Sequence, residues 1–128
     1  MLFRSDISKY TLGQVVRQRA TQSTLAQDGD VAVKSSYQIM VRSTDTQGNA
    51  IGAIATVVIP ETLASSPAVV SYQNFEDAVA FDCAPSWAFV AGEQLSDSAS
   101  LAANLEGPIV AGWALASGHY VVIPDHEG

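Results

Sequence analysis

Alternating apolar and polar positions predict a β-hairpin in the first half of the chain. Between residues 35 and 43 every second side chain is apolar or aromatic, and this period of two is typical of a half-exposed strand. Turn-forming residues follow at 44–49, and a more apolar stretch at 50–59 ends at Pro60. Two such stretches joined by a short loop with glycine and asparagine indicate an antiparallel hairpin.

Shorter apolar runs predict an α/β arrangement in the second half. Residues 68–72 and 120–124 resemble strands that are buried on both faces. Between them, Pro108 and Gly118 bracket an apolar segment of about ten residues, and proline at the start with glycine past the end is typical of a helix. A further one or two helical turns are expected within 83–92. Strand, helix and strand in this order form a βαβ unit with parallel strands, so we expect an α/β fold.

The two ends of the chain indicate that the domain is incomplete. The first 30 residues are polar and weakly patterned, and residues 12–16 are compatible with either a short strand or a loop over the core. After the strand at 120–124 a loop begins, but no helix follows it. We therefore interpret residues 1–128 as part of one larger domain, with a polar first segment at 1–30 and the first half of a sheet at 31–128.

Composition and charge exclude two classes of function. The chain is 48% apolar and only 15% charged, whereas an ordinary soluble domain has about 25% charged residues. All six basic residues lie in the first 42 positions, and the net charge is −7. Because such a surface repels a phosphate backbone, we expect no nucleic-acid binding. No apolar run approaches the ~20 residues of a membrane-spanning helix, and none at the start has signal-peptide length.

Carboxylates gather after the predicted strand at 68–72. Glu76, Asp77 and Asp82 follow it at the edge where α/β sheets place their sites, and Asp125 follows the last predicted strand at the same edge. Paired carboxylates can serve as acid and base on a glycosidic bond or bind a divalent cation. The alternative is that these side chains are solvated or cap loops and helices, and spacing alone does not decide between the two.

The sequence alone does not establish a functional role for either histidine or for the cysteine. His126 lies between Asp125 and Glu127 and could ligate a metal or act as a base, although such a loop more commonly fixes its own backbone through side-chain hydrogen bonds. His119 lies at a helix-to-strand corner on the opposite edge of the sheet, so we interpret it as a surface residue. Cys83 has no lysine or arginine nearby in the sequence to activate it, which favours a buried thiol or half of a disulfide.

Neither the aromatic residues nor the known sequence motifs indicate a complete active site. Three aromatic side chains are predicted to lie in the core rather than on a ligand platform: Trp87, Phe89 and Trp113. The chain contains no G-x-S-x-G, H-E-x-x-H, phosphate-binding loop or G-x-G-x-x-G motif. Judged on motifs alone, it holds no complete active site.

Two short motifs follow the strand at 68–72 and carry a resemblance. Residues 72–77 read Tyr-Gln-x-x-Glu-Asp, and residues 82–86 read Asp-Cys-Ala-Pro-Ser. Together they resemble the secretory lipase family of α/β-hydrolases from fungi and some actinobacteria. The similarity extends in order, at similar spacing, from about residue 12 to the end, through four further segments: 13–19, 37–45, 112–122 and 124–128.

The resemblance implies both a fold and an activity. In these α/β-hydrolases an antiparallel hairpin, a third strand, a helix and a fourth strand open a mixed sheet. The chain would then be the N-terminal portion of a secreted serine ester hydrolase, a triacylglycerol lipase or carboxylesterase acting on lipid esters. The Ser-Asp-His triad of this fold would lie beyond Gly128, so residues 1–128 alone would be inactive. The resemblance implies no metal and no organic cofactor.

The resemblance also implies roles for two residues. The backbone N–H of Asp77 corresponds to the first oxyanion-hole donor of the family. Cys83 matches a family cysteine that is expected to pair with a cysteine outside this segment, which suits a secreted protein. The alternative function is a non-catalytic binding domain or an inactive, truncated relic of the fold.

Overall fold

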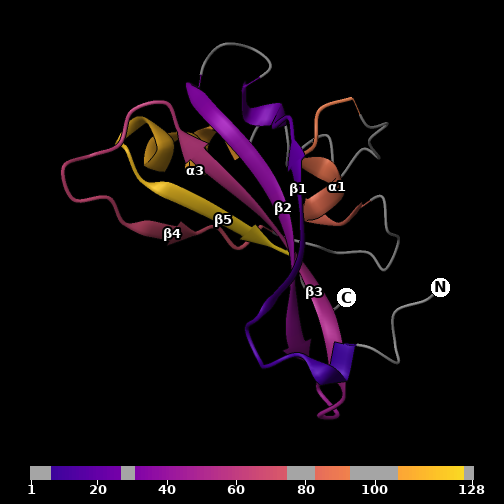
Figure 1. Ribbon diagram of the computed structural model, residues 1–128. Coiled ribbons are helices and arrows are strands. Elements are labelled where there is room, and N and C mark those ends of the chain that lie inside the picture. The colour runs from indigo at the N-terminus through magenta and orange to yellow at the C-terminus, as the bar shows by residue number, and fades with distance from the viewer. Residues whose placement is uncertain (1–6, 27–30, 75–82, 93–106, 126–128) are drawn as a thin grey trace.

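A five-stranded mixed sheet forms the centre of the structure (Figure 1). The computed structural model describes residues 7–26, 31–74, 83–92 and 107–125. The strand order is β1-β2-β3-β5-β4, and the strands are β1 (Val15–Thr21), β2 (Val33–Thr44), β3 (Ala50–Pro60), β4 (Val69–Ser71) and β5 (Tyr120–Pro124). The helices are α1 (Pro85–Ala88) and α3 (Gly107–Ala116), with short 3-10 helices η1 (Ile7–Lys9) and η2 (Thr24–Ala26).

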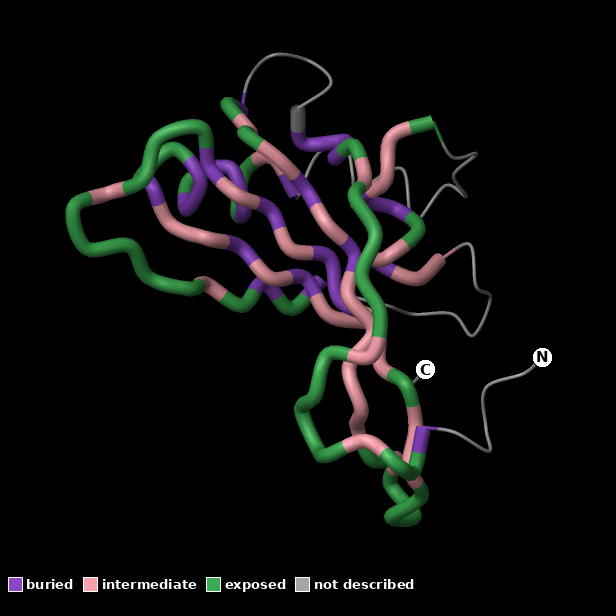
Figure 2. The backbone as a smooth tube through the Cα atoms, viewed as in Figure 1, coloured by how far each residue is buried: buried purple, intermediate pink, exposed green. Residues whose placement is uncertain are grey.

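The β2–β3 pair is the hairpin that the alternating pattern predicts. The two strands pair antiparallel from Val33 opposite Pro60 to Thr44 opposite Ala50. Figure 2 shows that buried positions gather in the half of the hairpin that faces the helices, whereas the turn end is half-buried or exposed. The hairpin therefore belongs to the core along only part of its length.

The β2–β3 turn is held by a single carboxylate. Asp45 Oδ1 accepts the backbone N–H groups of Gln47 and Asn49 at 2.9 and 2.7 Å, and Oδ2 accepts the Asn49 side-chain amide at 2.9 Å. The Asn49 side chain is the largest cause that lowers the pKa of Asp45 below its usual value of 3.8. Asp45 is thus a local turn residue, half-buried at the end of the hairpin away from the helices.

The predicted βαβ unit is confirmed by β4, α3 and β5. β4 and β5 run parallel, and β5 lies between β4 and the antiparallel β3. α3 is ten residues long and begins one residue before Pro108, where the missing N–H of proline is harmless. Gly118, with φ of +79°, follows the last turn and allows the chain to enter β5.

β1 begins in the region for which the sequence was compatible with either a short strand or a loop. It pairs antiparallel with β2 at one edge of the sheet, and most of its side chains are exposed, including those of Arg17 and Arg19. Charged side chains are common on edge strands because they discourage pairing with another chain. The polar segment at 1–30 therefore contributes a strand, which no apolar alternation marks because neither face of β1 is deeply buried.

The core lies between one face of the sheet and the two helices. Val58 of β3 and Val121 of β5 are adjacent across the strands and fully buried. Phe89, directly after α1, is also fully buried, and its ring meets the Tyr72 ring edge-on with centroids 6.1 Å apart. The prediction that Phe89 is a core aromatic is confirmed. The rest of this cluster comprises Leu25, Val31, Ala88, Ala111, Ala114, Leu115 and Ile123.

The same prediction is wrong for the two tryptophans. Trp87 and Trp113 are 38% and 67% exposed. α3 packs through its small residues, and a Cβ added to Gly112 would lie 3.0 Å from the Val31 side chain, so this face sits close to the core. The larger Ile109 and Trp113 therefore point outward. Within the part of the chain that the structure describes, neither helix has the length and apolar character that spanning a bilayer requires.

Candidate functional site

The structure describes only part of the set of residues that the sequence singled out. Five candidates lie outside the described residues: Glu76, Asp77, Asp82, His126 and Glu127. Among the residues that are described, no group of three or more histidine, cysteine or acidic side chains is arranged to hold a metal ion. Asp125 is described, and it lies at the carboxyl end of β5, the predicted edge.

The segment that leads from β4 toward Asp77 begins at a buried pair. Tyr72 and Asn74 are 8% and 3% exposed, and the Tyr72 hydroxyl donates to Asn74 Oδ1 at 2.8 Å. The Tyr72 backbone N–H donates to the Val122 carbonyl at 2.9 Å, which extends the β4–β5 pairing by one step. Because the Tyr72 ring also packs against Phe89, the backbone is fixed up to Asn74. We call Tyr72 and Asn74 the first anchor.

A second polar contact fixes the start of α1. Both oxygens of Asp125 accept hydrogen bonds from Ser86: Oδ1 from the backbone N–H at 2.7 Å and Oδ2 from the hydroxyl at 2.6 Å. Ala84, at the N-cap position, provides no side-chain cap. Asp125 therefore does from β5 what a local serine or aspartate does at other helix starts, accepting an otherwise unpaired N–H. We call Ser86 and Asp125 the second anchor.

Gln38 of β2 forms a further hydrogen bond with Ser86. Its side-chain amide donates to the Ser86 carbonyl, and its Oε1 accepts from Arg19 Nε and Nη2 at 2.8 and 2.5 Å. Gln38 is only 6% exposed, so its amide needs these partners. Ser86 is thus held through its N–H, its hydroxyl and its carbonyl, by the side chains of Gln38 on β2 and of Asp125, directly after β5.

A pocket of about 480 Å³ lies beside Ser86. Arg17, Arg19 and Trp87 contribute to its walls, together with apolar side chains such as Met40 and Ile54. Since Arg19 already donates to Gln38, its guanidinium is part of the structural hydrogen bonding around Ser86. Among the described residues that line this pocket, no nucleophile lies beside a base.

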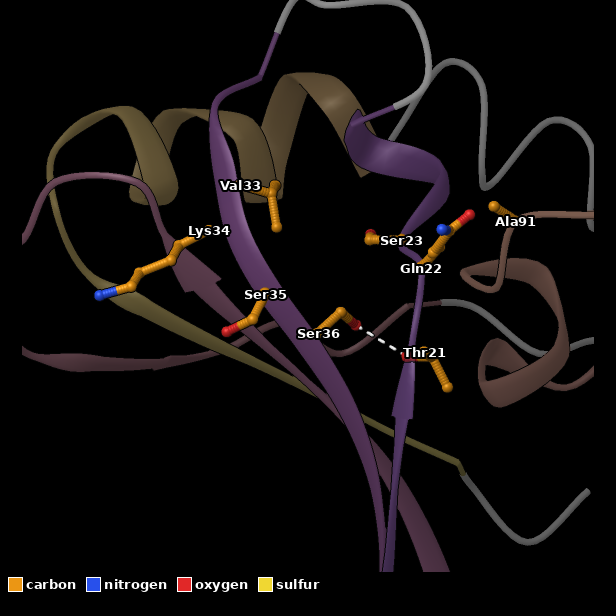
Figure 3. Close-up of a pocket in the computed structure, with 8 residues that line it drawn as sticks. All are labelled: Thr21, Gln22, Ser23, Val33, Lys34, Ser35, Ser36 and Ala91. Carbon is orange, nitrogen blue, oxygen red and sulfur yellow. Dashed lines mark hydrogen bonds between the residues drawn. The ribbon is translucent and has the colours of Figure 1, made fainter.

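A smaller, more polar pocket of about 320 Å³ lies between the end of β1 and the start of β2 (Figure 3). Three of its hydroxyl groups bond to one another or to the backbone: Thr21 Oγ1 lies 3.0 Å from Ser36 Oγ, and Ser23 Oγ accepts the Leu25 N–H. Figure 3 shows that the Lys34 side chain extends away from these groups. The side chains therefore do not converge on a common point where a ligand would bind.

His119 lies apart from both anchors. Its Nδ1 accepts the Ala68 N–H at 3.2 Å, directly before β5, whereas Asp125 lies after the other end of that strand. The predicted position on the opposite edge of the sheet is confirmed, and the side chain is half-buried there. Cys83 is half-buried too, and it is the single cysteine of the chain.

Comparison with other proteins shows where this arrangement recurs. No protein-family model matches the chain. Lipase A of Moesziomyces aphidis is 42% identical over 124 residues, which cover 97% of this chain and 26% of the lipase. The X-ray structure of Candida antarctica lipase A in its closed state superposes with a TM-score of 0.84 at 41% identity. The chain is homologous to lipase A. Lipase 1 of Candida albicans is 36% identical over 118 residues, 91% of this chain and 24% of that protein.

The match to lipase A confirms the predicted fold class. The superposition covers 97% of this chain but only 28% of the lipase A chain. The five strands and the helices described above therefore correspond to part of the lipase A fold, a mixed α/β sheet. The chain spans about a quarter of the length of the relatives that it matches. The resemblance inferred from the motifs at 72–77 and 82–86 is thus confirmed at the level of homology.

Sequence reasoning missed the roles of Ser86 and Gln38. Ser86 ends the Asp-Cys-Ala-Pro-Ser motif, but its partners Gln38 and Asp125 are 48 and 39 residues away in the sequence. Gln38 occupies a polar position of an alternating strand, where side chains commonly face solvent. The one available signal was Asp125, which was expected to fix the backbone of its own loop, whereas in the structure it accepts hydrogen bonds from Ser86, 39 residues away in the sequence.

Proposed function

We propose that the chain is part of a secreted serine ester hydrolase of the triacylglycerol lipase or carboxylesterase type. The observation that carries the proposal is the homology with lipase A, at 42% identity over 97% of this chain, combined with the TM-score of 0.84. The Ser-Asp-His triad lies beyond Gly128 in this proposal, because the chain spans only about a quarter of the related lipases. The substrates are acylglycerols or similar lipid esters.

The chemistry proposed for the complete protein is two-step acyl transfer. The triad serine attacks the ester carbonyl carbon while the histidine takes the serine proton. The tetrahedral intermediate then collapses, the alcohol leaves with that proton, and water hydrolyses the acyl-enzyme by the same route. The backbone N–H of Asp77 is one of two donors that stabilise the oxyanion, and the other follows the nucleophile. No metal or organic cofactor is required.

Exposed apolar side chains support the proposal that residues 1–128 are the N-terminal fragment of a larger domain. Ile109 and Trp113 on α3 are each 67% exposed, and so is Val69 of the edge strand β4. Ile109 and Trp113 are about one helical turn apart on α3, and apolar side chains gathered on one exposed helix face are typical of an interface. Further helices and strands of the same domain would cover it, which also accounts for the low charged fraction of this portion.

Secretion and a disulfide at Cys83 complete the proposal. Disulfides persist in oxidising environments outside the cell. Cys83 pairs, in this proposal, with a cysteine outside residues 1–128, and it would tie the segment before α1 to the rest of the domain. The half-buried position of Cys83, two residues before Pro85 at the start of α1, supports a structural role for it.

Ester hydrolysis tests the proposed function. We expect the complete protein to hydrolyse p-nitrophenyl esters and emulsified triacylglycerol, and we expect residues 1–128 alone to give no rate above the buffer blank. Titration of the released acid measures the second substrate without a chromogenic group. A complete protein that hydrolyses neither substrate would favour the non-catalytic alternative. Activity of residues 1–128 alone would contradict the assignment of the triad to the segment beyond Gly128.

A further inference from the structure

The pocket of about 480 Å³ beside Ser86 combines positive charge with apolar walls. Arg17 and Arg19 are two positions apart on β1, so both side chains lie on the same side of the sheet. Arg17 is opposite Met40 on β2, and Met40 is in turn opposite Ile54 on β3. Side chains that are opposite one another across strands lie close together. The strand register therefore forms a row that runs from a guanidinium to two apolar side chains.

α1 contributes the remaining wall of this pocket through Trp87. The Trp87 side chain is 38% exposed, and its neighbour Ser86 is fixed by hydrogen bonds to Gln38 and Asp125. The backbone that carries the Trp87 ring is therefore held against the sheet. A large aromatic side chain beside apolar strand residues such as Met40 provides a surface along which an alkyl chain can lie.

The positive side of the pocket is arranged before any ligand binds. Arg19 donates from Nε and Nη2 to Gln38 Oε1, which fixes the guanidinium plane. Within the described part of the chain, no residue accepts a hydrogen bond from Arg19 Nη1, and no described residue that lines the pocket is acidic. The chain as a whole has a net charge of −7. The pocket is therefore a local site of positive charge that attracts an anion.

We propose that this pocket binds the anion of a single-chain fatty acid. The carboxylate lies against Arg17 and Arg19, because guanidinium groups match carboxylates through paired N–H bonds. The alkyl chain lies along Met40, Ile54 and Trp87. The volume of about 480 Å³ falls within the roughly 300–1,000 Å³ of small-molecule sites. Since the site is a concavity, it suits one molecule that enters it better than the surface of a bilayer. The proposal does not rest on the proposed function, which gives these residues no part in ester hydrolysis.

Calorimetric titration of the complete protein with three ligands tests the chemistry of the site. Decanoate supplies an anionic head and a long alkyl chain, decanol supplies the chain without the charge, and butyrate supplies the charge with a short chain. We expect decanoate to bind, and we expect decanol and butyrate to bind more weakly by about tenfold or more. Equal affinities for decanoate and decanol would overturn the proposal, because the arginines would then contribute nothing.

Matched substitutions place the site on these residues. Arg17→Gln removes a charge from the pocket, and Lys34→Gln removes one from an exposed position of β2 outside it. Trp87→Ala and Trp113→Ala each remove an exposed tryptophan, inside and outside the pocket respectively. The Kd of decanoate should rise about tenfold or more in the Arg17 and Trp87 variants and stay within about twofold in the two controls. Arg17→Lys, which keeps the charge but not the planar fork, should recover part of the affinity.

Photolabelling locates the bound chain without any substitution. A decanoic acid that carries a diazirine near the end of its chain reacts on irradiation with the side chains that it contacts, and peptide mass spectrometry identifies them. We expect labels on Met40, Ile54 or Trp87, and we expect excess decanoate to prevent them. Labels confined to other residues, or an unchanged Kd in both Arg17→Gln and Trp87→Ala, would overturn the proposal. A protein that binds phosphatidylglycerol vesicles through Arg17 but binds no decanoate would overturn it too, because the arginines would then recognise a lipid surface.

Discussion

Gly118→Ala should destabilise the protein by about 2–5 kcal/mol. Gly118 has φ of +79°, a conformation that costs a residue with a Cβ about 1–2 kcal/mol. An added Cβ would lie 2.3 Å from the backbone N of Ala64, which cannot move as a flexible side chain would. Overpacking of this kind typically costs a further 1–3 kcal/mol, roughly, in a well-packed region.

The backbone hydrogen bonds around Gly118 explain why there is no room for a Cβ at this position. The N–H groups of Gly118 and His119 donate to the Leu115 and Ala114 carbonyls at 3.0 Å each, closing the C-terminus of α3. The Gly118 carbonyl then accepts the Ala64 N–H at 3.1 Å, so the two backbones lie in contact. One glycine therefore ends the helix and allows the loop before β4 to pack against the corner.

Gly48→Ala is the matched control for this prediction. Gly48 has φ of +86°, but a Cβ there would meet nothing within 4 Å. We expect Gly48→Ala to lower the free energy of unfolding by the conformational contribution alone, about 1–2 kcal/mol. Free energies of unfolding from urea titrations give both values, and equal losses in the two variants would contradict the close contact between Gly118 and Ala64.

Substitution of Asp77 should have the largest effect on catalysis. The proposed donor is the backbone N–H, so Asp77→Pro, which removes that N–H, should lower kcat about 10²–10³-fold. Asp77→Ala keeps the N–H but removes the carboxylate, and we expect a smaller loss of kcat because the backbone is less well held. KM should change less than kcat in both variants, since the donor acts on the transition state.

Asp82→Ala is the control for Asp77. Asp82 belongs to the same carboxylate group in the sequence, but the proposed mechanism gives it no part in the reaction. Its kcat should stay within about twofold of wild type. An unchanged kcat in Asp77→Ala and Asp77→Pro would overturn the oxyanion assignment. Equal losses at Asp77 and Asp82 would instead support a site built from paired carboxylates.

Much of the sheet could be predicted because its boundaries are marked locally. Pro60 ends β3, and Pro108 and Gly118 mark the two ends of α3, as the structure shows. These residues act through their own backbone restrictions, which do not depend on distant partners. Parallel pairing of β4 and β5 then follows from the order of strand, helix and strand.

The orientation of α3 could not be predicted because the helix is apolar on every side. Periodicity identifies a buried face only when the opposite face is polar. In α3 the choice is made by size: Ala111, Gly112 and Ala114 allow close packing, and Trp113 is left outside. The prediction of Trp113 as a core residue was wrong for this reason.

The polar contacts around Ser86 were hidden for a different reason. Gln38 and Ser36 lie on the polar side of an alternating strand, yet they are 6% and 3% exposed. The Gln38 side chain bonds to Ser86 of α1, 48 residues later, and the Ser36 hydroxyl lies 3.0 Å from that of Thr21 on β1. Contacts between such distant segments leave no local pattern in the sequence.

Labelling of the active-site serine tests the central claim most directly. A fluorophosphonate probe reacts covalently with the activated serine of serine hydrolases, and peptide mass spectrometry identifies the modified residue in the complete protein. We predict a single label on a serine beyond Gly128, within a G-x-S-x-G motif, and no label on residues 1–128 expressed alone. A label on Ser86 or any other serine of residues 1–128, or no label on a protein that hydrolyses esters, would contradict the assignment of this chain to the non-nucleophile portion of a serine ester hydrolase.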